Sequence, residues 1–344
     1  MMSSTDQHIA RLHAHGLIDL HFDLPMELYE KREKPGLFAA EFLPQWQAGD
    51  MGVVAAAVFI EDRYVPDKAL PVALGQIARL CAEMESSDQV RLCRSYAEIK
   101  AARAAGKIAV LITMEGVEPI GTDLDLLRIF YQLGVRVVGL TQFRSNAAGH
   151  GGIFAASGSP PEGLTEFGRQ VVRECERLGI ILDLAHINPA GFQEIVDLTK
   201  RPLIVSHSNA RRYHDIERNV SDEQIRMIGA RGGVIGVNAV LVSARREDAT
   251  LDCYVDHIEH LAGLIGMDGV GIGFDFFEFI YRQWPEERRR SLAARSREPH
   301  FVPDLSDHSH ARNLTRKLIE RGFSDEDIEK ILFRNWMRIL EELL

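Results

Sequence analysis

The chain of 344 residues is 46% hydrophobic and 26% charged, a composition typical of a globular protein with a large core. It excludes a disordered or collagen-like chain. The 40 basic and 50 acidic residues give a formal net charge of −10, which disfavours long-range attraction to nucleic acid or to an anionic membrane. We therefore expect a small-molecule partner and no nucleic-acid or membrane partner.

Targeting signals are not evident. The longest uninterrupted apolar run, 53–60, is much shorter than the roughly 20 residues that cross a bilayer. Because the first residues are polar, we expect neither a membrane span nor a signal peptide. The four cysteines are widely spaced and form no CxxC pair, which predicts reduced thiols and a cytoplasmic location.

Short apolar runs rich in β-branched residues alternate along the chain with segments of helical periodicity. There are eight of them, at 17–23, 53–60, 109–115, 135–142, 180–186, 203–208, 233–240 and 269–275. Near-continuous apolar runs of this kind are typical of parallel strands that are buried on both faces. The alternation predicts an α/β fold, a (β/α)₈ TIM-type barrel. We expect one domain over 1–344, with a short polar segment of about 1–15 ahead of the first strand.

The segments between the runs carry helix signals. Thr165, Ser221 and Ser324 stand where helix N-caps are expected, and Leu251 begins another amphipathic stretch. The stretch from Ser324 to the end predicts a closing helix packed on the barrel. Charge and proline accumulate in 276–306, for which we expect an exposed excursion near the barrel mouth.

Polar side chains gather at the carboxyl ends of the predicted strands, where barrels of this type place their active sites. These residues are His21, Asp23, Glu115, Gln142, His186, His207, Asn238 and Asp275. Residues two apart on a strand share a face, so His21 and Asp23 can both face the mouth while Phe22 packs outward. Buried without a partner, each ionisable group would cost several kcal/mol. The grouping therefore predicts a metal site.

Imidazoles and carboxylates together suit Zn²⁺, Mn²⁺ or Co²⁺. The expected ligands are His21, Asp23, Glu115, His186 and His207. Five protein ligands exceed what one catalytic tetrahedral zinc uses, so we expect two divalent ions. Glu115 is the expected bridge, because no lysine stands at a strand end to supply a carbamate.

Several segments resemble one known family. They are IDLHFDLP, ITMEGVEPIG, GLTEFGRQVVRECERLGIILDLAHI, IVSHSNAR, RNVSDEQIRMIGARGGVIGVN and GIGFDF, in this order from about residue 17. Together they resemble the renal (membrane) dipeptidase family of the amidohydrolase superfamily of metal-dependent barrels. The SHSNAR and RNVSDE blocks are specific to that family rather than to barrels in general.

The resemblance implies two zinc ions, one held by His21, Asp23 and Glu115 and the other by Glu115, His186 and His207. It also implies that Asp275 handles protons, that Arg218 receives the terminal carboxylate of the substrate, and that the protein is a homodimer. The hypothesis is a metal-dependent dipeptidase in which a metal-bridging hydroxide attacks the peptide bond. Asp275 would carry the proton from this nucleophile to the leaving amine.

Two residues depart from the family pattern. Gln142 stands where members often have a histidine thought to bind the scissile carbonyl oxygen, and Phe277 stands where a second aspartate appears. Gln142 can donate a hydrogen bond but carries no charge, so we expect it to contact substrate and to stabilise the oxyanion less well. We also expect Asn238 to contact the substrate.

Two other functions stay open: hydrolysis of another small amide, such as a lactam or an N-acyl amino acid, at the same site, and a catalytically silent metal-binding relative. We expect tripeptides to be poor substrates. Phe22, Phe143 and Phe277 would favour apolar side chains if they face the pocket.

The remaining histidines are expected to be structural or solvated. His150, in a glycine-rich loop, could enter the pocket, although an exposed loop is the default. The histidines expected on exposed surface are His257, His260, His308 and His310. We expect the charged run at 286–290 to be a solvated face as well.

Overall fold

The computed structural model describes residues 3–296 and 298–344, and its centre is a parallel sheet. The strands are β1 (Leu17–Phe22), β2 (Met51–Phe59), β3 (Val90–Leu92), β4 (Ile108–Glu115), β5 (Val135–Gly139), β6 (Ile181–Asp183), β7 (Ile204–Ser208), β8 (Val234–Val237) and β9 (Val270–Ile272). Their hydrogen-bonded order is β1-β2-β4-β5-β6-β7-β8-β9, and β3 pairs with β4 outside this path. The eight predicted strands are all present, and β3 is an addition that the sequence did not predict. The barrel prediction is confirmed.

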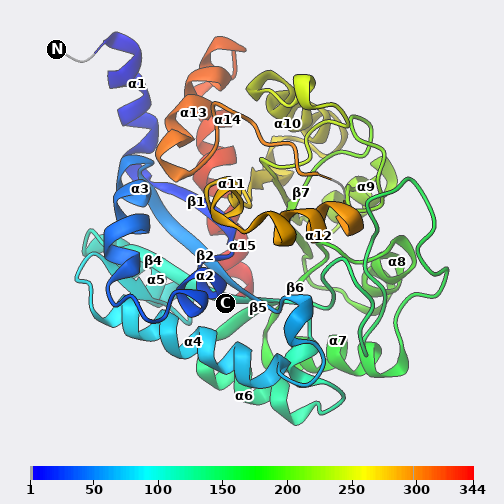
Figure 1. Ribbon diagram of the computed structural model, residues 1–344. Helices are drawn as coiled ribbons and strands as arrows, with labels where there is room; N and C mark the ends of the chain where they lie inside the picture. The colour runs from blue at the N-terminus through cyan, green and yellow to red at the C-terminus, as the bar shows by residue number, and fades with distance from the viewer. Residues whose placement is uncertain (1–2, 297) are drawn as a thin grey trace.

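Helices surround the strands (Figure 1). The α-helices are α1 (Ser4–Leu12), α2 (Leu24–Glu30), α3 (Leu43–Ala48), α4 (Ala69–Glu85), α5 (Tyr96–Ala104), α6 (Asp125–Leu133), α7 (Glu166–Leu178), α8 (Pro189–Leu198), α9 (Asp222–Ala230), α10 (Leu251–Ile265), α11 (Glu278–Gln283), α12 (Glu286–Ser296), α13 (Ala311–Glu320), α14 (Asp325–Glu329) and α15 (Asn335–Leu343). The side chains of Thr165, Ser221 and Ser324 accept backbone N–H bonds at the starts of α7, α9 and α14. The predicted N-caps are therefore confirmed.

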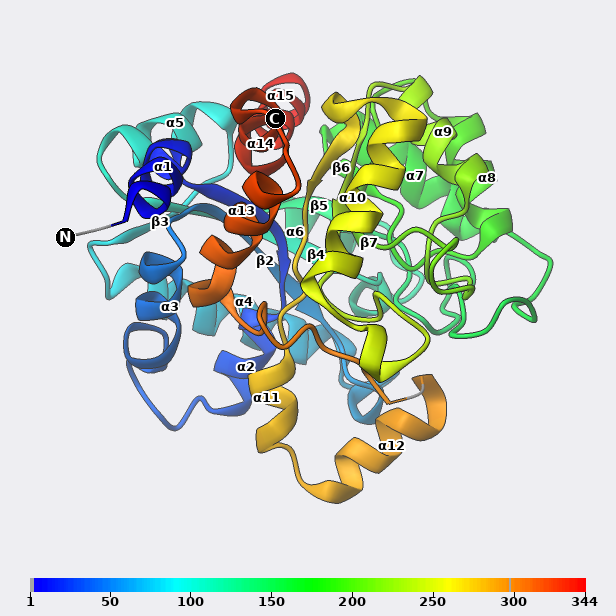
Figure 2. The same ribbon diagram turned by 90° about the horizontal axis from the view of Figure 1, so that it is seen from above.

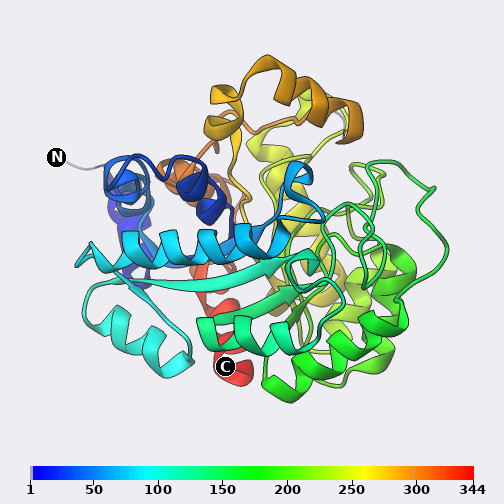
Figure 3. The same cartoon turned by 60° about the horizontal axis from the view of Figure 1, so that its bottom comes forward.

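The interior of the barrel is filled by one or two apolar side chains from each of β1, β2 and β4 to β8, and helix α15 packs against them. Trp336 of α15 is fully buried and donates its indole N–H to the carbonyl oxygen of Ile272. Figure 3 shows α15 on the side of the barrel opposite to α11 and α12. The predicted closing helix thus seals the end of the barrel away from the strand carboxyl ends.

The barrel closes through a side chain where β1 and β9 meet. Asp19 is fully buried, and its Oδ1 accepts the backbone N–H of Phe274 at 2.9 Å and that of His21 at 3.2 Å. Its Oδ2 accepts from Nε2 of the buried His308 at 2.8 Å. The backbone N–H of Asp275 also donates to the carbonyl oxygen of His21. The Asp19 carboxylate therefore connects the ends of β1 and β9, which neighbouring strands elsewhere in the barrel do through backbone hydrogen bonds.

The structure corrects two expectations, one about the N-terminal segment and one about residues 276–306. The N-terminal segment is not simply polar, because α1 buries Ile9 completely and Leu12 almost completely. The stretch 276–306 is not simply exposed: Phe276, Val302 and Leu305 are buried, and α11 and α12 stand together over one side of the barrel (Figure 2). Among the described residues, no helix combines the length and apolarity that crossing a membrane requires.

Candidate metal centre and active site

The five predicted metal ligands converge at the carboxyl ends of the strands. Nε2 of His186 lies 2.6 Å from Oε1 of Glu115 and 3.0 Å from Nε2 of His207. Nε2 of His21 lies 3.4 Å from Oδ1 of Asp23 and 3.9 Å from Oε2 of Glu115. Glu115, the last residue of β4, thus presents one oxygen to each side of the cluster.

A bulge in β1 sets the direction of His21. Opposite β2, Asp19 pairs with Val54 and Phe22 with Ala56, so β1 carries one extra residue between these pairs. An extra residue reverses the alternation of side chains beyond it. As a result Phe22 packs outward against aromatic rings of the helical layer instead of joining Ile18 and Leu20 inside the barrel.

Two members of the cluster lie on strained backbone. His186 has φ 67° and Asp275 has φ 57°, in the left-handed region that residues other than glycine rarely adopt. Such strain costs about 1–3 kcal/mol and persists where the surrounding structure imposes it. Two residues separate His186 from the end of β6 and Asp275 from the end of β9. At these positions both side chains lie over the barrel mouth.

The donor set fits divalent cations. The potential ligand atoms form three overlapping groups, in each of which all atoms lie within 4.8 Å of one another. The groups are His21, Asp23 and Glu115; Glu115, His186 and His207; and His21, His207 and Asp275. Within the described chain, the buried Asp23 Oδ1 has no hydrogen-bond donor. Nδ1 of His207 lies 2.7 Å from the Ser206 hydroxyl, which orients Nε2 of that ring toward the cluster.

The electrostatics of the cluster are those of closely packed buried charges. Burial lowers the pKa values of His186 and His207 and raises the pKa of Glu115. Although burial acts against it, the carboxylates of Asp23, Glu115 and Asp275 raise the pKa of His21 to about 10. A cation among these carboxylates would relieve their mutual repulsion.

Asp275 and Asn238 form a pair at the same mouth. The Nδ2 group of Asn238 donates to Oδ2 of Asp275 at 2.9 Å, and Oδ1 of Asn238 accepts the backbone N–H of Val240. Burial raises the pKa of Asp275 to about 7. Asn238 therefore contacts Asp275, and both side chains also line the cavity in which the metal cluster lies.

Arg218 is buried beside the cluster, with 4% of its surface exposed. Its Nη2 donates to the carbonyl oxygen of His207 at 3.0 Å, while Nη1 has no hydrogen-bond acceptor among the described residues. Burial lowers its pKa, and the carboxylates of Asp275 and Glu115 act in the opposite direction. An unused guanidinium donor at the cavity wall suits an anionic group of a ligand.

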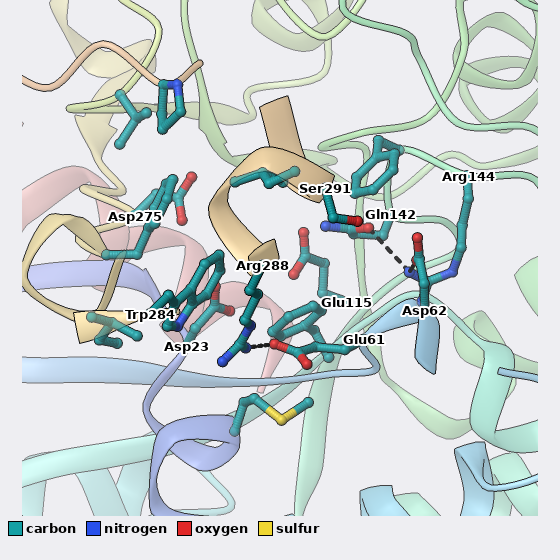
Figure 4. A pocket seen from close by; sticks show the side chains of 18 of the residues that line it. Asp23, Glu61, Asp62, Glu115, Gln142, Arg144, Asp275, Trp284, Arg288 and Ser291 are labelled. Atoms are coloured by element: carbon teal, nitrogen blue, oxygen red, sulfur yellow. Dashed lines mark hydrogen bonds and ion pairs between the residues drawn. The ribbon is translucent and has the colours of Figure 1, made fainter. Parts of the chain in front are cut away.

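The cavity above the cluster has a volume of about 1070 Å³ and is covered on one side by α11 and α12. Figure 4 shows Asp23, Glu115 and Asp275 facing it, with Gln142 and Arg144 at one edge. Arg288 of α12 stacks on Trp284, 3.8 Å from the ring centre, and forms an ion pair with Glu61 beyond β2. The charged run at 286–290 is thus not only a solvated face, because Arg288 lines the cavity.

Of the other aromatic and histidine side chains named in the sequence analysis, some line the cavity and others do not. Phe143 and Phe277 line the cavity, whereas Phe22 is fully buried in the helical layer and does not. The ring of His150 contacts the Ser145 hydroxyl and is not among the residues that line the cavity. His260 contacts Asp222.

The expectation of exposed surface was wrong for His257 and His308. His257 is fully buried on α10, where Nδ1 accepts the backbone N–H of Ala210 and Nε2 donates to the carbonyl oxygen of Val242. His308 is fully buried against Asp19. Only tertiary packing brings these partners together. His310 is more exposed and lies 3.1 Å from Asp307.

Sequence reasoning missed two buried carboxylates beneath the site. Asp183 accepts the backbone N–H groups of Ala185 and Ser206, which adjoin the cluster members His186 and His207. Asp19 similarly holds the N–H of His21. Each is a lone acidic residue inside an apolar run, and that is the signal that could have identified it.

Comparison with known proteins identifies the family. The model of the membrane dipeptidase family (peptidase family M19) matches residues 6–284 and 298–343. The chain belongs to this family. The resemblance inferred from the sequence motifs is therefore confirmed, and the protein is a peptide-bond hydrolase of the metallopeptidase class.

Curated relatives and a solved structure support the assignment to this family. An uncharacterized dipeptidase of Schizosaccharomyces pombe is 30% identical over 94% of this chain and 79% of its own length. Dipeptidase tcpJ of Claviceps purpurea is 31% identical over 75% of this chain, which spans only 56% of that protein. A Rhodobacter sphaeroides metallopeptidase, solved with a phosphinate mimic of the dipeptide L-Ala-D-Ala, superposes with a TM-score of 0.83 at 27% identity, covering 96% of this chain and 99% of its own.

Proposed function

We propose that this protein is a zinc dipeptidase with two metal ions. The observation that carries the proposal is the set of three overlapping ligand groups, two of which share Glu115. The unpaired Nη1 of Arg218 lies at the same cavity and would bind a substrate carboxylate. His21, Asp23 and Glu115 would hold one ion, and Glu115, His186 and His207 the other.

The ions held by these residues would supply a water of lowered pKa as the nucleophile and would polarise the scissile carbonyl group. Asp275 would accept the proton from the nucleophile and deliver it to the leaving amine. Asn238 would fix the orientation of the Asp275 carboxylate through the 2.9 Å hydrogen bond between them. Gln142 would donate a hydrogen bond to the carbonyl oxygen.

Strand order supports an extended substrate across the mouth. Arg218 donates a hydrogen bond to the carbonyl oxygen of His207 in β7, and Glu61 follows β2. In the hydrogen-bonded order of eight strands, β2 and β7 are four positions apart. These strands lie on opposite sides of the barrel. A dipeptide held by Arg218 at its carboxylate would lie over the metal ligands and direct its amino-terminal residue toward Glu61 and Arg288.

The second candidate is hydrolysis of another small amide at the same site. A cavity of about 1070 Å³ is at the large end for a small-molecule site, so it leaves room for a substrate bulkier than a small dipeptide. The alternative of a catalytically silent relative is set aside, because the chain belongs to a family of peptide-bond hydrolases.

The test combines metal analysis with a substrate panel. Purified protein saturated with zinc should contain two ions per chain and hydrolyse L,L and L,D dipeptides, whereas lactams and N-acyl amino acids should react slowly. One ion or fewer per chain would contradict the two-metal site. Turnover of N-acyl amino acids without turnover of dipeptides would favour the second candidate.

We also propose that the protein is located in the cytoplasm and that it is a homodimer. We further propose that residues 1–344 form one hydrolase domain. The four cysteines are free, and burial raises the pKa of Cys93 to about 11, in keeping with reduced thiols. Cell fractionation, light scattering of the purified protein and limited proteolysis test the three parts separately. A stable proteolytic fragment that retains only half of the barrel would contradict the single domain.

A further inference from the structure

We propose that Arg144 is a positioning residue that fixes the amide of Gln142 with its N–H₂ group toward the substrate carbonyl. The proposal rests on the hydrolase function above. It assigns a role to a residue that neither the sequence motifs nor the proposed metal chemistry uses.

The orientation of Gln142 follows from the chemistry of its neighbour. Nη1 of Arg144 lies 3.3 Å from Oε1 of Gln142. A guanidinium has donors only, so an amide beside it must present its oxygen. The nitrogen of the amide then points away from Arg144, and no described residue accepts a hydrogen bond from it. Because Gln142 lines the cavity, this N–H₂ group is available to a bound substrate.

Arg144 is itself held rigidly. Its Nη1 donates to Asp62 at 2.8 Å, its Nη2 donates to the carbonyl oxygen of Ile60, and its Nε lies 2.8 Å from Oε1 of Glu118. Glu118 is almost fully buried, with 4% of its side chain exposed. A guanidinium held by hydrogen bonds to Asp62 and Ile60 and by an ion pair with Glu118 cannot rotate without breaking several of these contacts.

The backbone around Glu118 supports this arrangement. Gly116 has φ 89°, and a Cβ atom there would lie only 2.2 Å from Oε2 of Glu118. The same Cβ would lie 3.4 Å from the backbone nitrogen of Gln142. The turn after β4 therefore brings Glu115, Glu118 and Gln142 together, with Glu115 directed to the metal cluster and Glu118 to Arg144.

The chemistry explains how a neutral side chain can serve in this place. An amide that rotates freely would present oxygen as often as nitrogen, and its oxygen would repel the negative charge that develops on the carbonyl. Fixing one rotamer in advance removes that reorganisation from the reaction. The gain appears in the transition state more than in ground-state binding, so it should affect kcat more than KM.

The kinetic test is a double-mutant cycle on the zinc-loaded enzyme with a dipeptide it hydrolyses. We expect Gln142→Ala to lower kcat about a hundredfold and Arg144→Met to lower it at least about tenfold with little change in KM. Because both act through one amide, the double variant should be no slower than Gln142→Ala alone. Arg231→Met is the matched control, since Arg231 binds backbone carbonyls of Thr199 and Val196 away from the site.

Additive losses in the double variant, or equal effects of Arg144→Met and Arg231→Met on kcat, would overturn the proposal. A second readout does not depend on activity or metal. The side-chain N–H₂ resonances of Gln142, identified by their loss in Gln142→Met, should shift in Arg144→Met but not in Arg231→Met, because only the first change removes the donor to Oε1 of Gln142. Unchanged resonances would also overturn it. Absence of dipeptide turnover in the wild-type enzyme would instead count against the proposed function and leave this readout decisive.

Discussion

Replacement of Asp19 by alanine should destabilise the whole barrel, although Asp19 is not a proposed ligand. Its carboxylate is fully buried and accepts three hydrogen bonds, from the N–H groups of His21 and Phe274 and from Nε2 of His308. Asp19→Ala leaves these three donors buried without an acceptor, at about 1–3 kcal/mol each. Relief of the buried carboxylate offsets part of this cost, so we expect a loss of about 3–5 kcal/mol, as for other broken buried pairs.

The assay is thermal unfolding with Asp19→Asn as the matched variant. At about 2.1 cal/mol/K of unfolding entropy per residue, a loss of 3–5 kcal/mol corresponds to a fall in Tm of about 4–7 °C for a chain of this length. Asparagine keeps an acceptor for the two backbone donors, and His308 can change tautomer to meet its N–H₂ group, because Nδ1 of His308 has no described partner. We expect Asp19→Asn to lose at most about 1 kcal/mol.

Equal, small shifts in Tm for both variants would refute the reasoning, because they would mean that this carboxylate does not hold β1 against β9. Zinc affinity provides an independent check. The N–H of His21 is one of the bonds lost, so Asp19→Ala should also weaken metal binding, as do other changes to groups that orient metal ligands, by about 10–100-fold.

The remaining predictions concern the cavity. Asp275→Asn should leave the metal content unchanged and lower kcat about a hundredfold or more, and a fully active variant would contradict the proposed proton transfer by Asp275. Arg218→Ala should raise KM at least about tenfold for free dipeptides but not for C-terminally amidated ones, and equal losses on both would contradict the carboxylate contact. Arg288→Ala should raise KM about fivefold, because a bound substrate loses a contact at the cavity wall that is worth about 1 kcal/mol. The control Arg290→Ala, whose exposed side chain contacts only Glu286 among the described residues, should leave KM unchanged.

Local signals in the sequence were sufficient for eight of the strands, for three helix starts and for a list of candidate metal ligands. Apolar runs buried on both faces appear as parallel strands, and Thr165, Ser221 and Ser324 cap helices where their spacing predicted. These features depend on a few adjacent residues. The candidate metal ligands could be listed for the same reason, because a polar residue at the end of an apolar strand indicates a position at the barrel mouth.

The partners of isolated polar residues could not be predicted in this way. We expected His257 on the exposed surface of a helix outside the barrel mouth and His308 in a solvated loop after the last strand, yet each is fully buried. His308 is 289 residues away from its partner Asp19. Nothing in the local pattern of either segment specifies such a contact, since it exists only once the barrel has closed.

The sequence by itself thus determined the eight barrel strands, three helix starts and the set of candidate metal ligands, because these follow from short-range periodicity and residue chemistry. The tertiary structure decided the orientation of individual side chains at the site. The extra residue in β1 turns His21 inward, and the contact of Arg144 with Gln142 orients an amide at the cavity edge. A bulge is defined only against the register of a neighbouring strand, and a side-chain rotamer only against its packing neighbours, so both are properties of the folded chain.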